Sequence, residues 1–209
     1  LEGVIAESFY AILAEKTNGN PFFAEQLLHY FIENELVECI EGQWQLKAGD
    51  IPLPESLNAV LIARIDRLTD DVKEVVKTAA VIGREFDVRL LSAMLKKAIT
   101  ELLPEVKLVE KSRIWHVLHE LLYIFKHALL RDIAYQMQLK ARLRELHQLA
   151  AETMERVYAP HLARWYADLA FHYEQAENRD KAVEYLEKAG DDAKAQYHNQ
   201  QALALYDRL

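Results

Sequence analysis

Apolar side chains recur every three or four residues along most of this chain, and few helix-breaking residues interrupt the pattern. Of the 209 residues, 51% are apolar, whereas only six are glycine and five are proline. Such spacing places apolar side chains on one face of a helix. The length is enough for one large domain or two small ones, each with its own core. We therefore predict a mainly α-helical globular protein.

The first 50 residues are predicted to form two helices and a hairpin. A helix should run from about Gly3 to Lys16, with apolar positions at Val4, Ile5, Phe9, Ile12 and Leu13. The segment 17–20 should end it, and Asn20 should cap the next helix. Pro21 then occupies the first turn, where a missing N–H costs nothing. Segments 36–40 and 44–46 predict a short β-hairpin around Gly42.

A second region is expected to begin in segment 48–54, which holds two prolines and precedes a change in charge. Helices are predicted over 57–68, from Thr69 or Asp70 to a left-handed cap at Gly83, and from a cap at Asp87. A further helix over 99–111 would contain Pro104. Segments 114–118 and 121–125 predict another hairpin. Helices followed by a hairpin fit a winged helix.

The last third of the chain is predicted to form a helical array. Helices are expected over 139–158, over 162–175, and after a cap at Asn178. The small residues Ala170, Ala182 and Ala189 have spacings like those of a tetratricopeptide repeat, whose helices approach closely. We predict α-solenoid helices of this kind over 156–209. A partial echo of 178–182 at 199–202 indicates one full unit and the start of another.

Charge and composition disfavour several kinds of partner. The formal net charge is −8, and it divides into −7 for residues 1–50, +3 for 51–150 and −4 for 151–209. No block has the dense basic face that nucleic acid requires, so a direct nucleic-acid partner is not expected. No apolar run approaches membrane-spanning length. The single cysteine, Cys39, cannot form an internal disulfide, which fits a reducing cytoplasm.

Catalytic chemistry is not predicted for this chain. The sequence has no Gly-x-x-x-x-Gly-Lys-Ser/Thr loop and no apolar strand ending in paired carboxylates for magnesium. His116 and His119 lie three residues apart, but zinc needs three or four convergent ligands. We therefore expect no enzyme activity, no metal site and no cofactor bound by this chain alone.

His127 is the most informative candidate for binding. It lies between an apolar strand-like run, 121–125, and a half-apolar helical segment, 128–135. A histidine there stands beside the unpaired N–H groups of a helix N-terminus, a position suited to a phosphate or carboxylate. A core histidine satisfied by its neighbours is the alternative. For Arg131 and Asp132, next along this segment, a local ion pair on the helix surface is expected.

Several segments resemble those of STAND-type signalling ATPases, the relatives of apoptosome and plant resistance proteins. The matching segments are Thr17-Asn-Gly-Asn-Pro-Phe-Phe, with Glu25-Gln-Leu-Leu after it, Ala79-Ala-Val-Ile-Gly-Arg-Glu-Phe, Phe125-Lys-His-Ala-Leu-Leu-Arg-Asp and Arg144-Glu-Leu-His. The resemblance implies lid helices and a hairpin of a nucleotide-binding module over 1–50, a winged helix over 51–155 and repeats over 156–209. It also implies a larger bacterial regulator with a P-loop domain before this region.

In that family the proline of the Gly-x-Pro element packs on adenine, and the histidine contacts the β-phosphate of ADP. The resemblance therefore implies nucleotide contacts by Pro21 and His127, and ADP or ATP with magnesium, in the longer protein only. Ala128 departs from the family motif, which has aspartate there. A plain helix–helix turn is the alternative for Pro21. The pair Arg64 and Arg67 is also familiar from the family, and a solvated face or an interdomain contact is expected for it.

Two other functions remain open on the sequence. The chain is alternatively a protein-binding scaffold of the tetratricopeptide type without nucleotide linkage, which predicts an exposed groove among Trp165, Tyr166, Tyr173 and Tyr185, unless these rings form the solenoid core. A DNA-reading winged helix would use segment 101–111. That segment holds three glutamates against two lysines, which is the wrong balance for a phosphate-lined groove.

Overall fold

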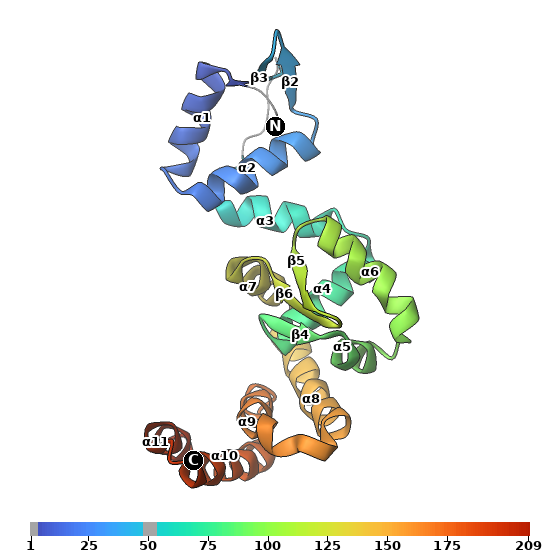
Figure 1. Ribbon diagram of the computed structural model, residues 1–209, viewed down its shortest axis with the longest axis vertical. Helices are drawn as coiled ribbons and strands as arrows, with labels where there is room; N and C mark the ends of the chain where they lie inside the picture. The colour runs from blue at the N-terminus through green and yellow to red at the C-terminus, as the bar shows by residue number, and fades with distance from the viewer. Residues whose placement is uncertain (1–3, 48–53) are drawn as a thin grey trace. The chain divides into compact units, whose positions relative to one another are not determined.

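The computed structural model describes residues 4–47 and 54–209, and these residues are mainly helical (Figure 1). They contain eleven α-helices, one 3₁₀ helix and two three-stranded sheets. The predicted mainly α fold is confirmed. The chain forms two compact units, one ending at Thr69 and the other running from Asp70 to Leu209. Most of the predicted boundary segment 48–54 lies outside the described residues.

The first unit consists of three helices and a small sheet. Its elements are β1 (Val4–Ile5), α1 (Glu7–Thr17), α2 (Pro21–Glu33), β2 (Val37–Ile40), β3 (Gln43–Leu46) and α3 (Leu57–Asp66). The sheet has the order β1-β3-β2, in which β2 and β3 form the predicted hairpin. The prediction of helix at Val4 and Ile5 was wrong, because these residues pair in parallel with Gln43 and Trp44. A partner so distant in sequence leaves no local signal.

Local capping explains where the helices of the first unit begin and end. Asn18 and Gly19 have positive φ values of 48° and 75°, which end α1. The side chain of Asn20 then accepts a hydrogen bond from the Phe23 N–H at 3.1 Å, and Pro21 is the first residue of α2, as predicted. Glu41 and Gly42, both with positive φ, form the hairpin turn.

Helix α3 packs on α2 within the first unit. Arg64 Nη1 donates to Gln26 Oε1 at 2.5 Å, and Arg67 forms an ion pair with Glu33 at 2.9 Å. Arg64 is only 7% exposed, so the prediction of a solvated face was wrong for this residue. The expected boundary between residues 50 and 51 would separate α2 from α3, whereas the compact units divide at Thr69. A guanidinium buried against Gln26 accounts for this difference.

The second unit opens with an alternation of helices and strands around an aromatic core. Its first elements are α4 (Asp70–Ile82), β4 (Glu85–Asp87), α5 (Val88–Leu95), α6 (Ile99–Lys111), β5 (Trp115–His119) and β6 (Leu122–Phe125). The antiparallel sheet has the order β4-β6-β5. The strand β4 was missed from sequence, although it carries Phe86, whose ring lies 4.8 Å from that of Trp115. Tyr123 and Phe125 complete this core.

The helix boundaries here follow the predicted signals with one exception. Asp87 caps α5 by accepting from the Arg89 N–H at 2.7 Å, and α6 accommodates Pro104 in its interior. Helix α4 ends before Gly83, as expected. However, Gly83 has a φ of 158°, which is not the predicted left-handed helical cap, because the chain continues directly into β4. A Cβ at Gly83 would lie 3.2 Å from the carbonyl oxygen of Glu85.

The rest of the second unit is helical. It comprises α7 (Ala128–Gln136), α8 (Lys140–Val157), the 3₁₀ helix η1 (Ala159–Trp165), α9 (Tyr166–Gln175), α10 (Arg179–Ala195) and α11 (Asn199–Tyr206). The helix expected over 162–175 begins later, at Tyr166, because the chain kinks at His161 (φ −138°, ψ 36°) and winds as 3₁₀ helix after Pro160. Asn178 caps α10 as predicted.

Helices α8 to α11 pack each on the next, as Figure 1 shows for the orange to red part of the chain. The predicted small residues Ala170, Ala182 and Ala189 are buried between them. Tyr173 and Tyr185 are buried and stacked, with centroids 5.6 Å apart, so they do not line the exposed groove that the scaffold alternative requires. One core cluster continues from Leu90 of α5 to Leu205 of α11, across the boundary expected at 155–156.

Helices α10 and α11 approach each other closely at Gly190, and this contact leads to a first prediction. A Cβ at this position would lie 2.4 Å from Cε1 of Tyr206 in α11. We expect Gly190→Ala to destabilise the second unit by about 1–3 kcal/mol, the usual cost of overpacking. Chemical denaturation would measure it.

The matched control is the same change in a Tyr206→Ala background. There the clash is absent, and alanine should gain roughly 0.5–1 kcal/mol over glycine through helix propensity. Equal effects of Gly190→Ala in both backgrounds would contradict the close packing of α10 on α11.

Candidate functional site

Pro21, the first predicted site residue, lies in the first unit. It is exposed at the start of α2, directly after the Asn20 cap. Thr17, which precedes the turn, is buried, so the turn is anchored to the core while the proline ring faces outward. The geometry gives a rigid apolar ring at a helix N-terminus.

His127, the second predicted site residue, lies in the second unit. It occupies the N-cap position of α7, directly after the last strand of the sheet, and is half-buried. Its side chain does not cap the helix. The residue itself stands at the N-terminus of α7. Pro21 and His127 belong to different compact units.

Arg131 fixes α7 to the preceding helix. Its Nε donates to the carbonyl oxygen of Ala80 in α4 at 2.8 Å, and the guanidinium lies 4.8 Å from the ring centroid of Tyr135. The expected ion pair with Asp132 is present at 3.2 Å. Arg131 is half-buried, so its main contact is with the backbone of another helix rather than with its neighbour.

The side chains of Tyr135, His147 and His172 form a hydrogen-bonded triad that runs from α7 into the helical array. Tyr135 Oη lies 2.8 Å from His147 Nε2 in α8, and His147 Nδ1 lies 2.9 Å from His172 Nδ1 in α9. Both histidines are buried, with exposed fractions of 0% and 2%. Two neutral arrangements satisfy the hydrogen bonds of this triad. In one, Tyr135 donates to His147 and His147 donates to His172; in the other, every donor and acceptor is exchanged.

Burial of the triad keeps both imidazoles neutral. Desolvation lowers the pKa of His147 to about 4 and the pKa of His172 to about 3. The positive charge of Arg131 contributes to both shifts, and His147 further lowers the pKa of His172. Around neutral pH the triad of Tyr135, His147 and His172 therefore carries no charge.

The sequence did not reveal the triad of Tyr135, His147 and His172. His147 enters the sequence prediction only as part of the Arg144–His147 motif, and His172 is not among the predicted site residues. A signal was present, because His147 shares the buried face of α8 with Ala150, Ala151 and Met154 at helical spacing. What spacing could not show is that the buried faces of α8 and α9 bring the two imidazoles together.

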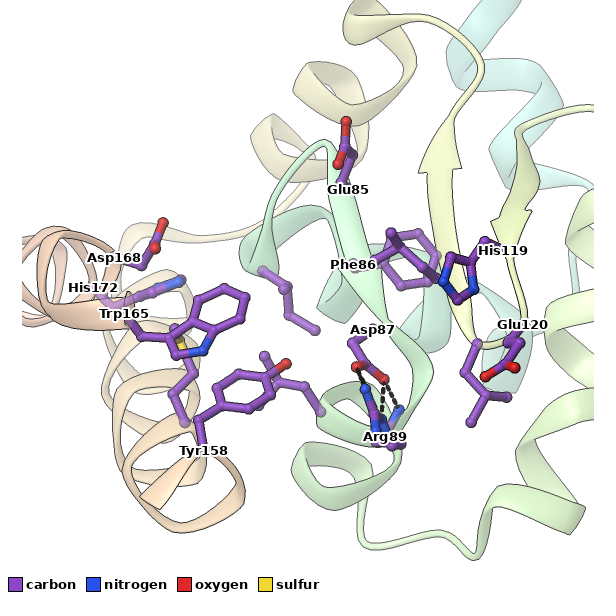
Figure 2. Close-up of a pocket in the computed structure, with 15 residues that line it drawn as sticks. Glu85, Phe86, Asp87, Arg89, His119, Glu120, Tyr158, Trp165, Asp168 and His172 are labelled. Atoms are coloured by element: carbon purple, nitrogen blue, oxygen red, sulfur yellow. Dashed lines mark hydrogen bonds and ion pairs between the residues drawn. The ribbon is translucent and has the colours of Figure 1, made fainter. Parts of the chain in front are cut away.

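A cleft of about 560 Å³ opens within the second unit, next to the triad (Figure 2). Phe86, Asp87 and Arg89 line it from β4 and α5, and His119 and Glu120 line it from the turn between β5 and β6. The opposite side carries Tyr158, Trp165, Asp168 and His172 from the end of α8, η1 and α9. Neither Pro21 nor His127 lines this cleft, whereas Trp165, which the scaffold alternative placed in a groove, does.

The cleft combines stacked aromatic rings with acidic groups. Tyr158 and Trp165 are parallel within 10°, with centroids 4.4 Å apart. Burial raises the pKa of Tyr158 to about 12, so its hydroxyl stays protonated. Asp87 forms an ion pair with Arg89 at 2.5 Å. Asp168 is exposed at the mouth of the cleft, yet the surrounding protein desolvates its carboxylate and raises its pKa.

The structure offers neither a metal cage nor a membrane span in its described parts. Within residues 4–47 and 54–209, no three histidine, cysteine, aspartate or glutamate side chains gather as metal ligands. No helix in the same ranges is both long enough and apolar enough to cross a membrane.

Comparison with known proteins gives this chain no family: no protein-family model matches it, and no curated protein matches it. The arguments for function therefore rest on the residues and on their geometry.

Proposed function

We propose that this chain is the regulatory and interaction region of a STAND-type signal-transducing ATPase, in which nucleotide state is coupled to protein binding through helical repeats. The observation that carries the proposal is the place of His127. It stands where the last strand of a three-stranded sheet passes into the N-terminus of α7. In the motif that Phe125–Asp132 resembles, this is the histidine that contacts the β-phosphate of ADP.

The order of elements around His127 supports the proposal. From α4 to β6 the chain runs helix, strand, helix, helix, strand, strand, and the strands have the spatial order β4-β6-β5. A winged helix has this order. The helices that follow pack on one another through small residues, as in a tetratricopeptide array. The capped turn before Pro21 fits the Gly-x-Pro element of a nucleotide lid.

The proposed switch works through differential affinity. In the ADP state of the longer protein, His127 contacts the β-phosphate while Pro21 packs on the adenine, and a preceding P-loop domain supplies the remaining nucleotide and magnesium contacts. A protein partner that binds the repeats only in the open state favours exchange of ADP for ATP. Ala128 in place of aspartate implies that the loop after His127 is held in another way. A bacterial cytoplasm is the proposed location.

Nucleotide binding by the full-length protein tests the proposal. Calorimetry should show tight ADP binding that His127→Ala and Pro21→Ala each weaken at least tenfold, which corresponds to about 1.4 kcal/mol. His198→Ala is the matched control, because His198 is an exposed histidine at the start of α11. ADP affinity that is unchanged in His127→Ala would contradict the switch and leave the nucleotide-independent scaffold as the better function.

A further inference from the structure

Three carboxylates of the cleft form no ion pair within the described residues. Arg89 is paired with Asp87, whereas Glu85, Glu120 and Asp168 have no lysine or arginine within ion-pair distance among the described residues. Asp168 lines the same side of the cleft as Tyr158, Trp165 and His172, so it brings an unpaired carboxylate to the aromatic side. The charge of the cleft therefore favours a cationic ligand.

The aromatic side of the cleft favours an organic cation over a metal ion. The rings of Tyr158 and Trp165 form a flat stacked surface beside Asp168. Such a surface attracts ammonium and guanidinium groups through the ring quadrupole and also packs against alkyl chains. A small metal ion gains nothing from these rings, and no three ligands gather for one in the described residues.

His172 supplies a directed polar contact. The side chain is 2% exposed, its Nδ1 is bound to His147, and its Nε2 makes no hydrogen bond within the described residues. His172 also lines the cleft, one helical turn after Asp168 on the same face of α9. An ammonium group has three donors, so it can bind Asp168 and this nitrogen together.

We propose that this cleft binds an organic cation, a primary ammonium or guanidinium group on an aliphatic chain, between Asp168 and the Tyr158–Trp165 stack. The volume of about 560 Å³ suits a small ligand or one inserted side chain. The site is independent of the nucleotide proposal. An ammonium donor on His172 Nε2 selects the arrangement in which His172 donates to His147 and His147 donates to Tyr135. Binding in the cleft thereby determines which groups of the triad donate hydrogen bonds, as far as Tyr135 on α7.

The test uses the whole chain labelled with ¹⁵N and four probes: cadaverine, agmatine, a peptide with one central lysine, and the same peptide with norleucine. We expect the indole N–H signal of Trp165 to shift with the cationic probes at millimolar concentration and not with norleucine. The signal of Trp115 should stay in place, because that residue is buried in the aromatic core. A response to the peptide alone identifies an inserted side chain, and a response to the free amines identifies a small molecule.

Variants make the test decisive. Asp168→Asn should weaken binding at least tenfold, whereas Asp180→Asn, an exposed aspartate at the start of α10, should leave it unchanged. Both variants should keep the wild-type unfolding temperature, since both side chains are exposed. No Trp165 shift with any cationic probe, or equal losses in the two variants, would overturn the proposal.

Discussion

Acidification from pH 7 to pH 5 should destabilise the second unit by about 4 kcal/mol, roughly 2 kcal/mol for each of two buried histidines. In the folded unit, burial lowers the pKa of His147 to about 4 and that of His172 to about 3. Unfolding returns both imidazoles to water, where their pKa is near 6.5. Below pH 6.5 the unfolded state therefore binds more protons than the folded state, so stability falls until the pH reaches the folded pKa values of about 4 for His147 and about 3 for His172.

Denaturant unfolding followed at the Trp115 indole N–H would measure this dependence, because Trp115 reports on the second unit. Carboxylates with ordinary pKa values near 4 contribute little above pH 5, whereas Asp168, whose pKa burial raises, acts in the opposite direction because it binds a proton more readily in the folded state. Glutamine does not titrate, so His147→Gln should remove about half of the dependence of stability on pH. His198→Ala, at an exposed position, should leave this dependence unchanged. A flat stability profile between pH 7 and pH 5 would show that the two imidazoles are not buried together.

Trp115→Ala should have the largest effect of any single substitution considered, a loss of about 3–5 kcal/mol in the second unit. The indole is 1% exposed and lies among Phe86, Tyr123 and Phe125. Its N–H also donates to the carbonyl oxygen of Val106 at 3.0 Å. Removal leaves a cavity at the centre of the sheet and an acceptor without its donor. Since domains of this kind have only about 5–15 kcal/mol of stability, this loss should clearly lower the unfolding temperature of the unit.

Circular dichroism and thermal unfolding would measure the effect. Trp115→Phe retains an aromatic ring and should cost clearly less than the alanine change. Trp165→Ala is a second control, because Trp165 is only half-buried at the edge of the cleft. A Trp115→Ala variant with wild-type stability would contradict the aromatic core.

The sequence by itself predicted the elements that local interactions specify. Asn20, Asp87 and Asn178 cap helices because a side-chain oxygen reaches an N–H two or three residues ahead. The turn before β3 was also locally predictable, because Gly42 readily adopts the positive φ that the turn requires, whereas the positive φ of Glu41 is not favoured by its residue type. The position of His127 at a strand-to-helix junction also follows from neighbouring residues.

The tertiary structure decided everything that depends on partners far apart in sequence. Strands β1 and β4 have two and three residues, too few for a periodic signal, and they exist because β3 and β6 offer unpaired backbone groups. Arg64 is buried because Gln26 accepts its hydrogen bond. The pairing of His147 with His172 and the cleft beside them arise only when α8 and α9 pack. Sequence periodicity identifies a buried face, but it does not identify which buried faces meet.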